Sequence, residues 1–166
     1  ASLDAMGARG ELIRAGTEWD VIEENRRQMI KECPDVYFEI TPTVSIMNVY
    51  HLPDFHKEWI DEGLLEPQNV RMNILTYPTE YRIQIIPPNE RKKFIDKYEE
   101  HITWIDDNFG DGAAKRGFES ILDFLQQENY ENLIPDFIDR NTPLDELRGE
   151  SLYQVAPELE FFKRYE

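Results

Sequence analysis

The sequence predicts an α/β fold with about three mainly parallel strands and a helical C-terminal region. Residues 36–41 and 70–74 alternate apolar with polar side chains, as strands with one buried face do. Residues 87–110 instead repeat apolar side chains every three or four positions, as amphipathic helices do. A parallel connection needs a long crossover, so strands that alternate with helices favour a parallel sheet.

The strands are expected in the N-terminal part of the chain. The expected elements, in order, are an opening loop, a helix over 17–33, a strand over 36–41, an apolar stretch over 44–50 and a short helix over 53–63. The alternating segments 70–74 and 81–85 then form strands, or one strand and a hairpin return. Thr17 is placed to cap the first helix, and Pro34 ends it. Pro42 ends the regular pairing of the first strand, and Gly63 closes the short helix.

The rest of the chain is expected to be helical. Pro87 and Pro88 open a long helix, which ends at Phe109 and Gly110. A further helix carries apolar residues over 118–125, and Thr142-Pro143 begins another short helix. We therefore expect a first unit over 1–110 and a helical extension over 111–166 that packs on it.

Composition excludes several classes of function. The chain has 34 acidic and 18 basic residues in 166, and its formal charge of −16 repels a nucleic-acid backbone. It contains neither an apolar run long enough to cross a membrane nor a basic segment that leads into a short apolar stretch. We therefore expect a cytoplasmic protein, and the single cysteine, which cannot form an internal disulfide, fits a reducing compartment.

Several segments, taken in order, resemble the C-terminal portion of radical S-adenosylmethionine enzymes of the twitch-domain subgroup. Residues 2–7 (SLDAMG) and 14–20 (RAGTEWD) resemble the segment around the fourth strand of that family, and residues 41–55 (TPTVSIMNVYHLPDF) resemble the region of its fifth strand. Residues 73–78 (NILTYP) with 83–88 (IQIIPP) resemble its sixth strand and the exit from it. Residues 147–151 and 156–159 resemble its C-terminal segment. The resemblance implies a partial (half) radical-SAM-type β/α barrel, which holds the fourth to sixth strands.

The resemblance also implies a set of cofactor-binding residues. In such enzymes, polar residues after the fourth strand contact the ribose of S-adenosylmethionine, and an arginine meets its carboxylate. The positions that match are Ser2 and Asp4 for the ribose, Arg14 for the carboxylate, Thr43, Ser45 and Asn48 on the fifth strand near cofactor or substrate, and Asn73 on the sixth.

The chain departs from the family in its cysteines. The [4Fe–4S] cluster needs three closely spaced thiolates, and Cys33 is the single cysteine here. We therefore expect a fragment that contributes cofactor and substrate contacts but is inactive alone, with the cluster in a full-length parent. A motif that begins at the second residue suggests that an upstream half of the barrel lies elsewhere. That half, or self-association through the open sheet edge, is the expected partner. The alternative is a non-catalytic binding or self-association module.

Simpler explanations compete with these assignments. Ser2, Asp4 and Arg14 could lie in a solvated loop, and Thr43 and Ser45 could satisfy the backbone at a polar strand end.

Other chemistry-bearing residues favour structural roles. His51 and His56 are five positions apart and share no helical face, so with Asp54 they are a poor metal site. Cys33 is expected to be a small buried thiol, and the carboxylates over 96–107 to form the wet face of a helix. We therefore assign no catalytic residue and no metal ligand.

Overall fold

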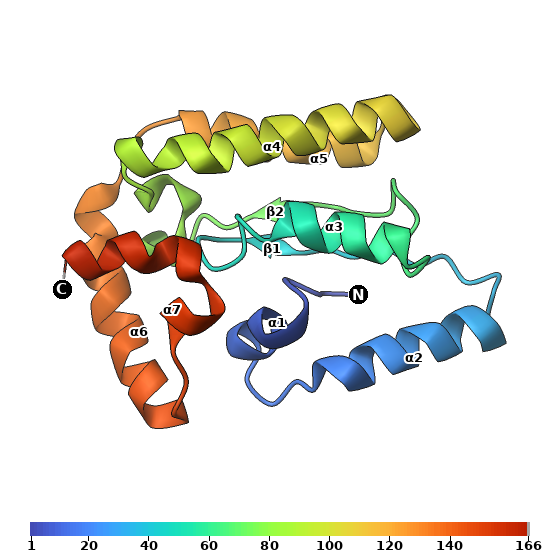
Figure 1. Cartoon of the computed structure of the whole chain (residues 1–166), viewed down its shortest axis with the longest axis horizontal. Coiled ribbons are helices and arrows are strands. Elements are labelled where there is room, and N and C mark those ends of the chain that lie inside the picture. Colours follow the sequence, from blue (N-terminus) through green and yellow to red (C-terminus); the bar gives the residue numbers. More distant parts are fainter. Residues whose placement is uncertain (166) are drawn as a thin grey trace.

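A computed structural model describes residues 1–165 and shows a mostly helical protein arranged in three tiers (Figure 1). Helix makes up 62% of the chain, and the sheet in the described part has two strands. The upper tier holds α4 (Pro88–Phe109) and α5 (Ala113–Gln126), the middle tier α3 (Leu52–Asp61), β1 (Thr43–Val44) and β2 (Asn73–Ile74), and the lower tier α1 (Gly7–Ile13) and α2 (Trp19–Glu32).

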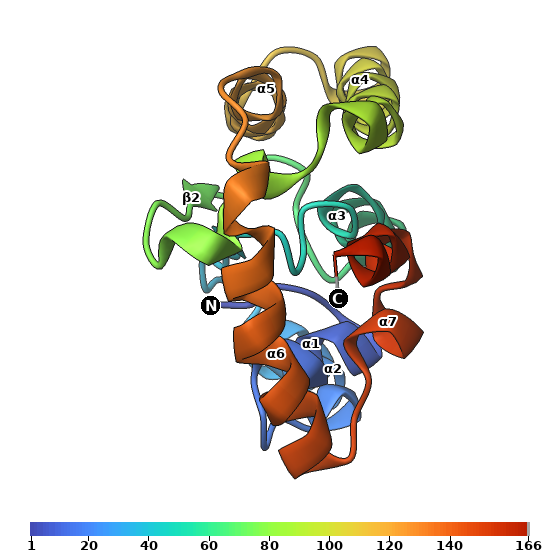
Figure 2. The same cartoon turned by 90° about the vertical axis from the view of Figure 1, so that its left-hand side faces the viewer.

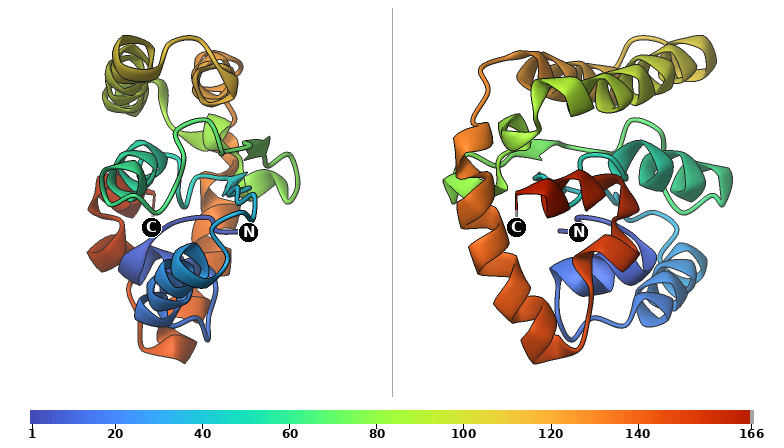
Figure 3. Two further views of the ribbon diagram at one scale, coloured as in Figure 1. Left: turned by 90° about the vertical axis from the view of Figure 1, so that its right-hand side faces the viewer. Right: turned by 60° about the vertical axis from the view of Figure 1, so that its left-hand side comes forward.

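One long helix crosses all three tiers. Figure 2 shows α6 (Ile134–Arg148) running from the α5 end of the upper tier down past the strands to α1. The chain then turns back towards the middle tier through α7 (Leu152–Val155) and the 3₁₀ segment η4 (Pro157–Arg164), as both views in Figure 3 show. Segments from the two ends of the chain therefore meet beside the small sheet.

The prediction of a partial barrel was wrong. The strands that form are short and parallel, with Thr43 opposite Asn73 and Val44 opposite Ile74. One further parallel bridge joins Ile40 to Val70. Helices, rather than further strands, cover this pair, so the fold is a helical assembly around a minimal sheet.

In the apolar stretch over 44–50, which the resemblance places in the fifth-strand region, strand pairing ends at Val44 and side-chain hydrogen bonds replace it. Asn48 accepts a hydrogen bond from the backbone N–H of Ser45 at 2.8 Å, and the N–H groups of Asn48 and Val49 both donate to the Ser45 carbonyl. An amide side chain that bonds nearby backbone offers the chain an alternative to a ladder. The apolar residues of this stretch are therefore buried on turns.

The expected strand over 81–85 forms two short 3₁₀ segments, η1 (Thr79–Tyr81) and η2 (Ile83–Ile85). Backbone N–H groups donate three residues back, from Tyr81 to Pro78 and from Ile86 to Ile83. Ile83 and Ile85 are both fully buried, together with Ile86. Burial on more than one side produced the apolar pattern, so alternation was a misleading sign here.

Of the long helices, α2, α4 and α5 were predicted correctly, and the ends of α4 show why. Pro88 lies in the first turn of α4, where a missing N–H costs nothing, and Gly110 follows with a φ of 72°. The expected helix over 17–33 is α2, although Glu18 rather than Thr17 precedes it, and the Glu11 carboxylate rather than Thr17 accepts the backbone N–H of Trp19 at its start. The prediction that the Cys33 thiol is buried was wrong, because Cys33 is exposed.

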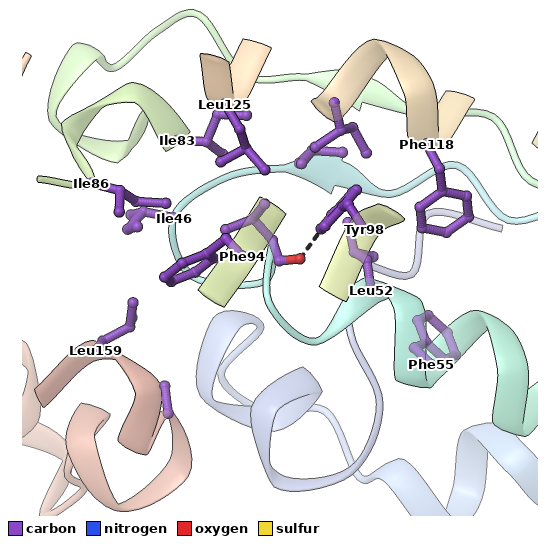
Figure 4. Close-up of a cluster of buried hydrophobic side chains, with 14 of the residues drawn as sticks. Ile46, Leu52, Phe55, Ile83, Ile86, Phe94, Tyr98, Phe118, Leu125 and Leu159 are labelled. Atoms are coloured by element: carbon purple, nitrogen blue, oxygen red, sulfur yellow. Dashed lines mark hydrogen bonds between the residues drawn. The ribbon is translucent and has the colours of Figure 1, made fainter. Parts of the chain in front are cut away.

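The core runs through all three tiers, and Figure 4 shows part of it, where the upper and middle tiers meet. Phe94, Tyr98 and Phe118 from α4 and α5 meet Leu52 and Phe55 of α3, and all are 2% exposed or less. The Tyr98 hydroxyl donates to the Val49 carbonyl at 2.7 Å, so its one polar atom is satisfied. In the described part of the chain, no helix is long and apolar enough to cross a membrane.

Candidate ligand-binding cavity

A cavity of about 310 Å³ lies between the N-terminal segment, the end of β1 and the side of α6. Its wall is mixed, with polar side chains set among apolar ones. The polar lining residues are Asp4, Thr43, Ser45, Tyr81, Asn141, Asp145 and Arg148, and the apolar ones are Leu12, Ile13, Met47, Leu75, Pro78 and Leu144. A concave site with a few converging polar groups is typical of small-molecule binding.

The predicted cofactor-binding residues gather at one side of this cavity. Asp4, Thr43 and Ser45 line it directly. The other four lie close behind: Ser2, Arg14 and Asn48 each join this group by hydrogen bonds, and Asn73 is the parallel strand partner of Thr43. Their role in binding a cofactor stays a prediction.

The Asp4 carboxylate joins the N-terminal segment to β1 on this side of the cavity. One carboxylate oxygen accepts the backbone N–H of Thr43 at 2.8 Å, and the other accepts Nε of Arg14 at 2.8 Å. Arg14 also donates from Nη2 to the Ser2 hydroxyl at 2.8 Å. Asp4 is buried, whereas the Arg14 side chain is 46% exposed. The ion pair therefore ties the N-terminal segment to β1 and places the Asp4 carboxylate at the cavity wall.

Asn48 holds the backbone on this side of the cavity in place from the protein interior. It is fully buried, and its amide nitrogen donates to the carbonyls of Asp4 and Thr43 at 2.8 and 2.9 Å. Its amide oxygen accepts the Ser45 N–H. All of these partners are backbone groups, so Asn48 fixes the backbone that presents Thr43 and Ser45 to the cavity.

Buried contacts of α1 set the position of the N-terminal segment. The guanidinium of Arg9 donates to Glu158 and to the Val155 carbonyl, each at 3.0 Å, and the Arg9 and Glu158 side chains are 7% and 9% exposed. Gly10 lets the helix approach Trp19 closely, because a Cβ at this position would lie 3.1 Å from Cε3 of the Trp19 ring and 2.8 Å from the Ala5 carbonyl oxygen. The first helix is thus held between α2 and the C-terminal segment.

Sequence reasoning missed the opposite wall, which α6 supplies. Asn141 accepts the Tyr81 hydroxyl at 3.2 Å, Asp145 accepts the backbone N–H of Leu152 at 2.7 Å, and Arg148 donates to the Leu12 carbonyl at 3.1 Å. Burial raises the pKa of the Tyr81 hydroxyl, which favours its neutral, donating form.

The spacing of these α6 residues was an available signal. Asn141, Asp145 and Arg148 are separated by four and three positions, which places them on one helical face. The expected helix start at Thr142-Pro143 divided that face between two segments. In the structure α6 continues through Pro143, at the cost of one backbone hydrogen bond.

The histidines considered as metal ligands lie in separate environments. His51 accepts the backbone N–H of Met6 at 3.3 Å, whereas His56 contacts the Pro67 carbonyl at 2.9 Å and His101 at 3.0 Å. The Pro67 carbonyl can only accept, so Nε2 of His56 carries a hydrogen and its Nδ1 accepts from His101. The His56–His101 pair is thus a buried hydrogen-bonded link between α3 and α4.

An iron–sulfur cluster does not fit the described residues. Cys33 lies exposed just after α2, and no group of three cysteine, histidine or carboxylate side chains suited to a metal ion occurs within residues 1–165. In comparisons with known proteins, no family model, no curated protein and no solved structure matches this chain.

Proposed function

We propose that the chain supplies S-adenosylmethionine and substrate contacts to a radical S-adenosylmethionine enzyme, and that it is catalytically inert alone. One observation carries this proposal. Residues selected for their resemblance to that family, from Ser2 to Asn73, form one connected group beside one cavity. A set of unrelated surface residues would have no reason to converge in this way.

The chemistry of the cavity suits such a cofactor. S-adenosylmethionine carries hydroxyls on its ribose and both positive and negative charges on its methionine end. The strand side offers the Thr43 and Ser45 hydroxyls and the Asp4 carboxylate. Hydroxyls both donate and accept, and a carboxylate can pair with a positive charge of the cofactor.

The proposal assigns no step of radical chemistry to this chain. Reductive cleavage of the cofactor needs an iron–sulfur cluster, and the chain has one cysteine. A separate upstream half must supply that cluster, and it is the partner that the proposal requires. A cytoplasmic location remains part of the same proposal.

Calorimetric titration of the full chain with S-adenosylmethionine tests the proposal. Thr43→Val removes a lining hydroxyl while keeping side-chain shape, and should weaken binding about five-fold, the effect of one lost hydrogen bond. Thr103→Val is the matched control, because Thr103 is an exposed residue of α4 far along the chain. Absence of any binding to the unaltered chain would refute the proposal.

A specific observation also favours self-association, one form of the alternative, which is a non-catalytic binding or self-association module. Large apolar side chains are exposed near one another in sequence: Val21 and Ile30 on α2 are 49% and 37% exposed, and Val36 and Tyr37 are 52% and 70% exposed. Exposed apolar groups and open strand edges favour contacts with other chains. Sedimentation over a range of protein concentrations decides this, since a monomer at every concentration would exclude self-association.

A further inference from the structure

Two opposite charges on α6 face the cavity side by side. Asp145 and Arg148 are three positions apart on the helix, and both line the cavity. Residues at this spacing are neighbours on a helix surface and commonly form an ion pair, as Glu160 and Lys163 do at 2.9 Å. Within the described residues, however, no salt bridge joins Asp145 to Arg148.

Each of these side chains is anchored by one atom only. Oδ2 of Asp145 accepts the Leu152 N–H at 2.7 Å, and Nη1 of Arg148 donates to the Leu12 carbonyl at 3.1 Å. The nearest carboxylate to Arg148 belongs to Glu150, at 3.9 Å, which is too long for a hydrogen bond. Among the described residues, Oδ1 of Asp145 and both Nε and Nη2 of Arg148 make no hydrogen bond.

We propose that Asp145 and Arg148 bind the α-amino acid group of a substrate with an aliphatic side chain. An α-amino acid carries an ammonium and a carboxylate on one carbon, which matches an acceptor and a cationic donor on one helix face. The planar guanidinium can hold the carboxylate through two hydrogen bonds, and Asp145 can accept from the ammonium.

The remaining wall fits the rest of such a substrate. Leu12, Ile13 and Leu144 line the cavity beside the two charges, and these apolar groups favour an aliphatic side chain over a polar one. The inference rests on the proposed function only in naming this ligand as the substrate, on the α6 side, with the cofactor contacts on the strand side.

Arg148 is better placed than Arg14 to bind an incoming carboxylate. Arg14 already donates to Asp4 and Ser2 and does not line the cavity. Arg148 lines it and has a free edge. The arginine that meets a ligand carboxylate in this cavity is therefore on α6.

Titration of the full chain with L-leucine, followed by backbone amide NMR shifts, tests the inference. We expect shifts in residues 141–152, and binding at least ten-fold weaker for L-leucinamide, which lacks the carboxylate, and for 4-methylpentanoate, which lacks the ammonium. Arg148→Gln and Asp145→Asn should each weaken L-leucine binding about ten-fold, the loss of a charge-assisted hydrogen bond. Arg148→Lys keeps the charge but loses the planar guanidinium, so its affinity for L-leucine should lie between those of the unaltered chain and Arg148→Gln.

Arg140→Gln is the matched control, because Arg140 lies on the same helix and pairs with Glu80 but does not itself line the cavity. Equal binding of L-leucine, its amide and its deaminated analogue would overturn the inference, as would full affinity in folded Arg148→Gln. If S-adenosylmethionine binds but L-leucine does not, the inference fails and the proposed function stands. If L-leucine binds through Arg148 but S-adenosylmethionine does not bind, the inference stands and the proposed function fails.

Discussion

The upper tier and the cavity satisfy their polar groups in opposite ways. Between α3, α4 and α5, the Tyr98 hydroxyl and the His56–His101 pair direct their hydrogen bonds inward, to backbone or to each other. Around the cavity, Asp145 and Arg148 each keep hydrogen-bonding capacity that the chain does not use. The difference separates a region that stabilises the fold from one that can bind a ligand.

The largest expected effect lies in the upper tier. Phe118 is fully buried on α5, and its ring contacts the rings of His56, Tyr98 and His101. Phe118→Ala should lower the free energy of unfolding by about 4 kcal/mol, through lost burial and the cavity left behind. Chemical denaturation measures this. A loss below about 1 kcal/mol would mean that the tier repacks freely.

Asn48→Ala tests whether stability and ligand binding meet at the cavity corner. The variant leaves the Asp4 and Thr43 carbonyls and the Ser45 N–H without their buried partner. We expect a loss of about 3 kcal/mol in unfolding free energy, together with loss of binding at the cavity. Asn132→Ala, at an exposed position, should change neither quantity. Unaltered ligand binding in folded Asn48→Ala would contradict the assigned role.

Acid should destabilise the protein through its histidines. Burial lowers the pKa of His51 and His56 to about 4, and burial next to His56 lowers that of His101 to about 3. An unfolded histidine titrates near 6.5, so between these values the unfolded chain binds more protons and stability falls as the pH drops. Each histidine should contribute a loss of roughly 1 kcal/mol per pH unit.

His101→Gln isolates one part of this acid effect. Glutamine keeps a donor for Nδ1 of His56 but does not titrate. Between pH 6.5 and 4.5, the variant should lose about 2 kcal/mol less stability than the unaltered chain. Denaturation curves at several pH values measure the difference, and parallel pH profiles would show that His101 is not kept neutral by the fold.

The smallest expected effect concerns one hydroxyl. Tyr98→Phe leaves the ring in place and removes the donor to the Val49 carbonyl. The unfolding free energy should fall by about 1 kcal/mol, and binding at the cavity should not change, because Tyr98 does not line it. Coupled loss of stability and binding in this variant would show that the two regions are not independent.

Periodicity was sufficient for the upper tier but not for the sheet. In α4, Phe94, Tyr98 and Ile105 recur at helical spacing and are all fully buried, so a local pattern contained the answer. The apolar residues Ile83, Ile85 and Ile86 are buried as well, yet they lie on tight turns. Which backbone partner such a stretch finds depends on distant segments, which a local pattern does not encode.

The candidate site divides in a similar way. Asp4, Thr43, Ser45 and Asn48 were found through resemblance, and the structure brings them together. The α6 wall was missed, because Pro143 was taken as a helix start rather than as a tolerated interior residue. Arg148 and Leu12 are 136 positions apart in the sequence, so the spacing of neighbouring residues cannot predict their contact.

Hydrogen exchange of the full chain, with and without S-adenosylmethionine, tests most directly whether binding and folding lie in different regions. Ligand binding slows exchange in the segments that it contacts. We predict slower exchange within residues 2–14 and 43–48, and no change in α4 and α5. Slower exchange confined to α4 and α5, or no change anywhere at saturating ligand, would contradict it.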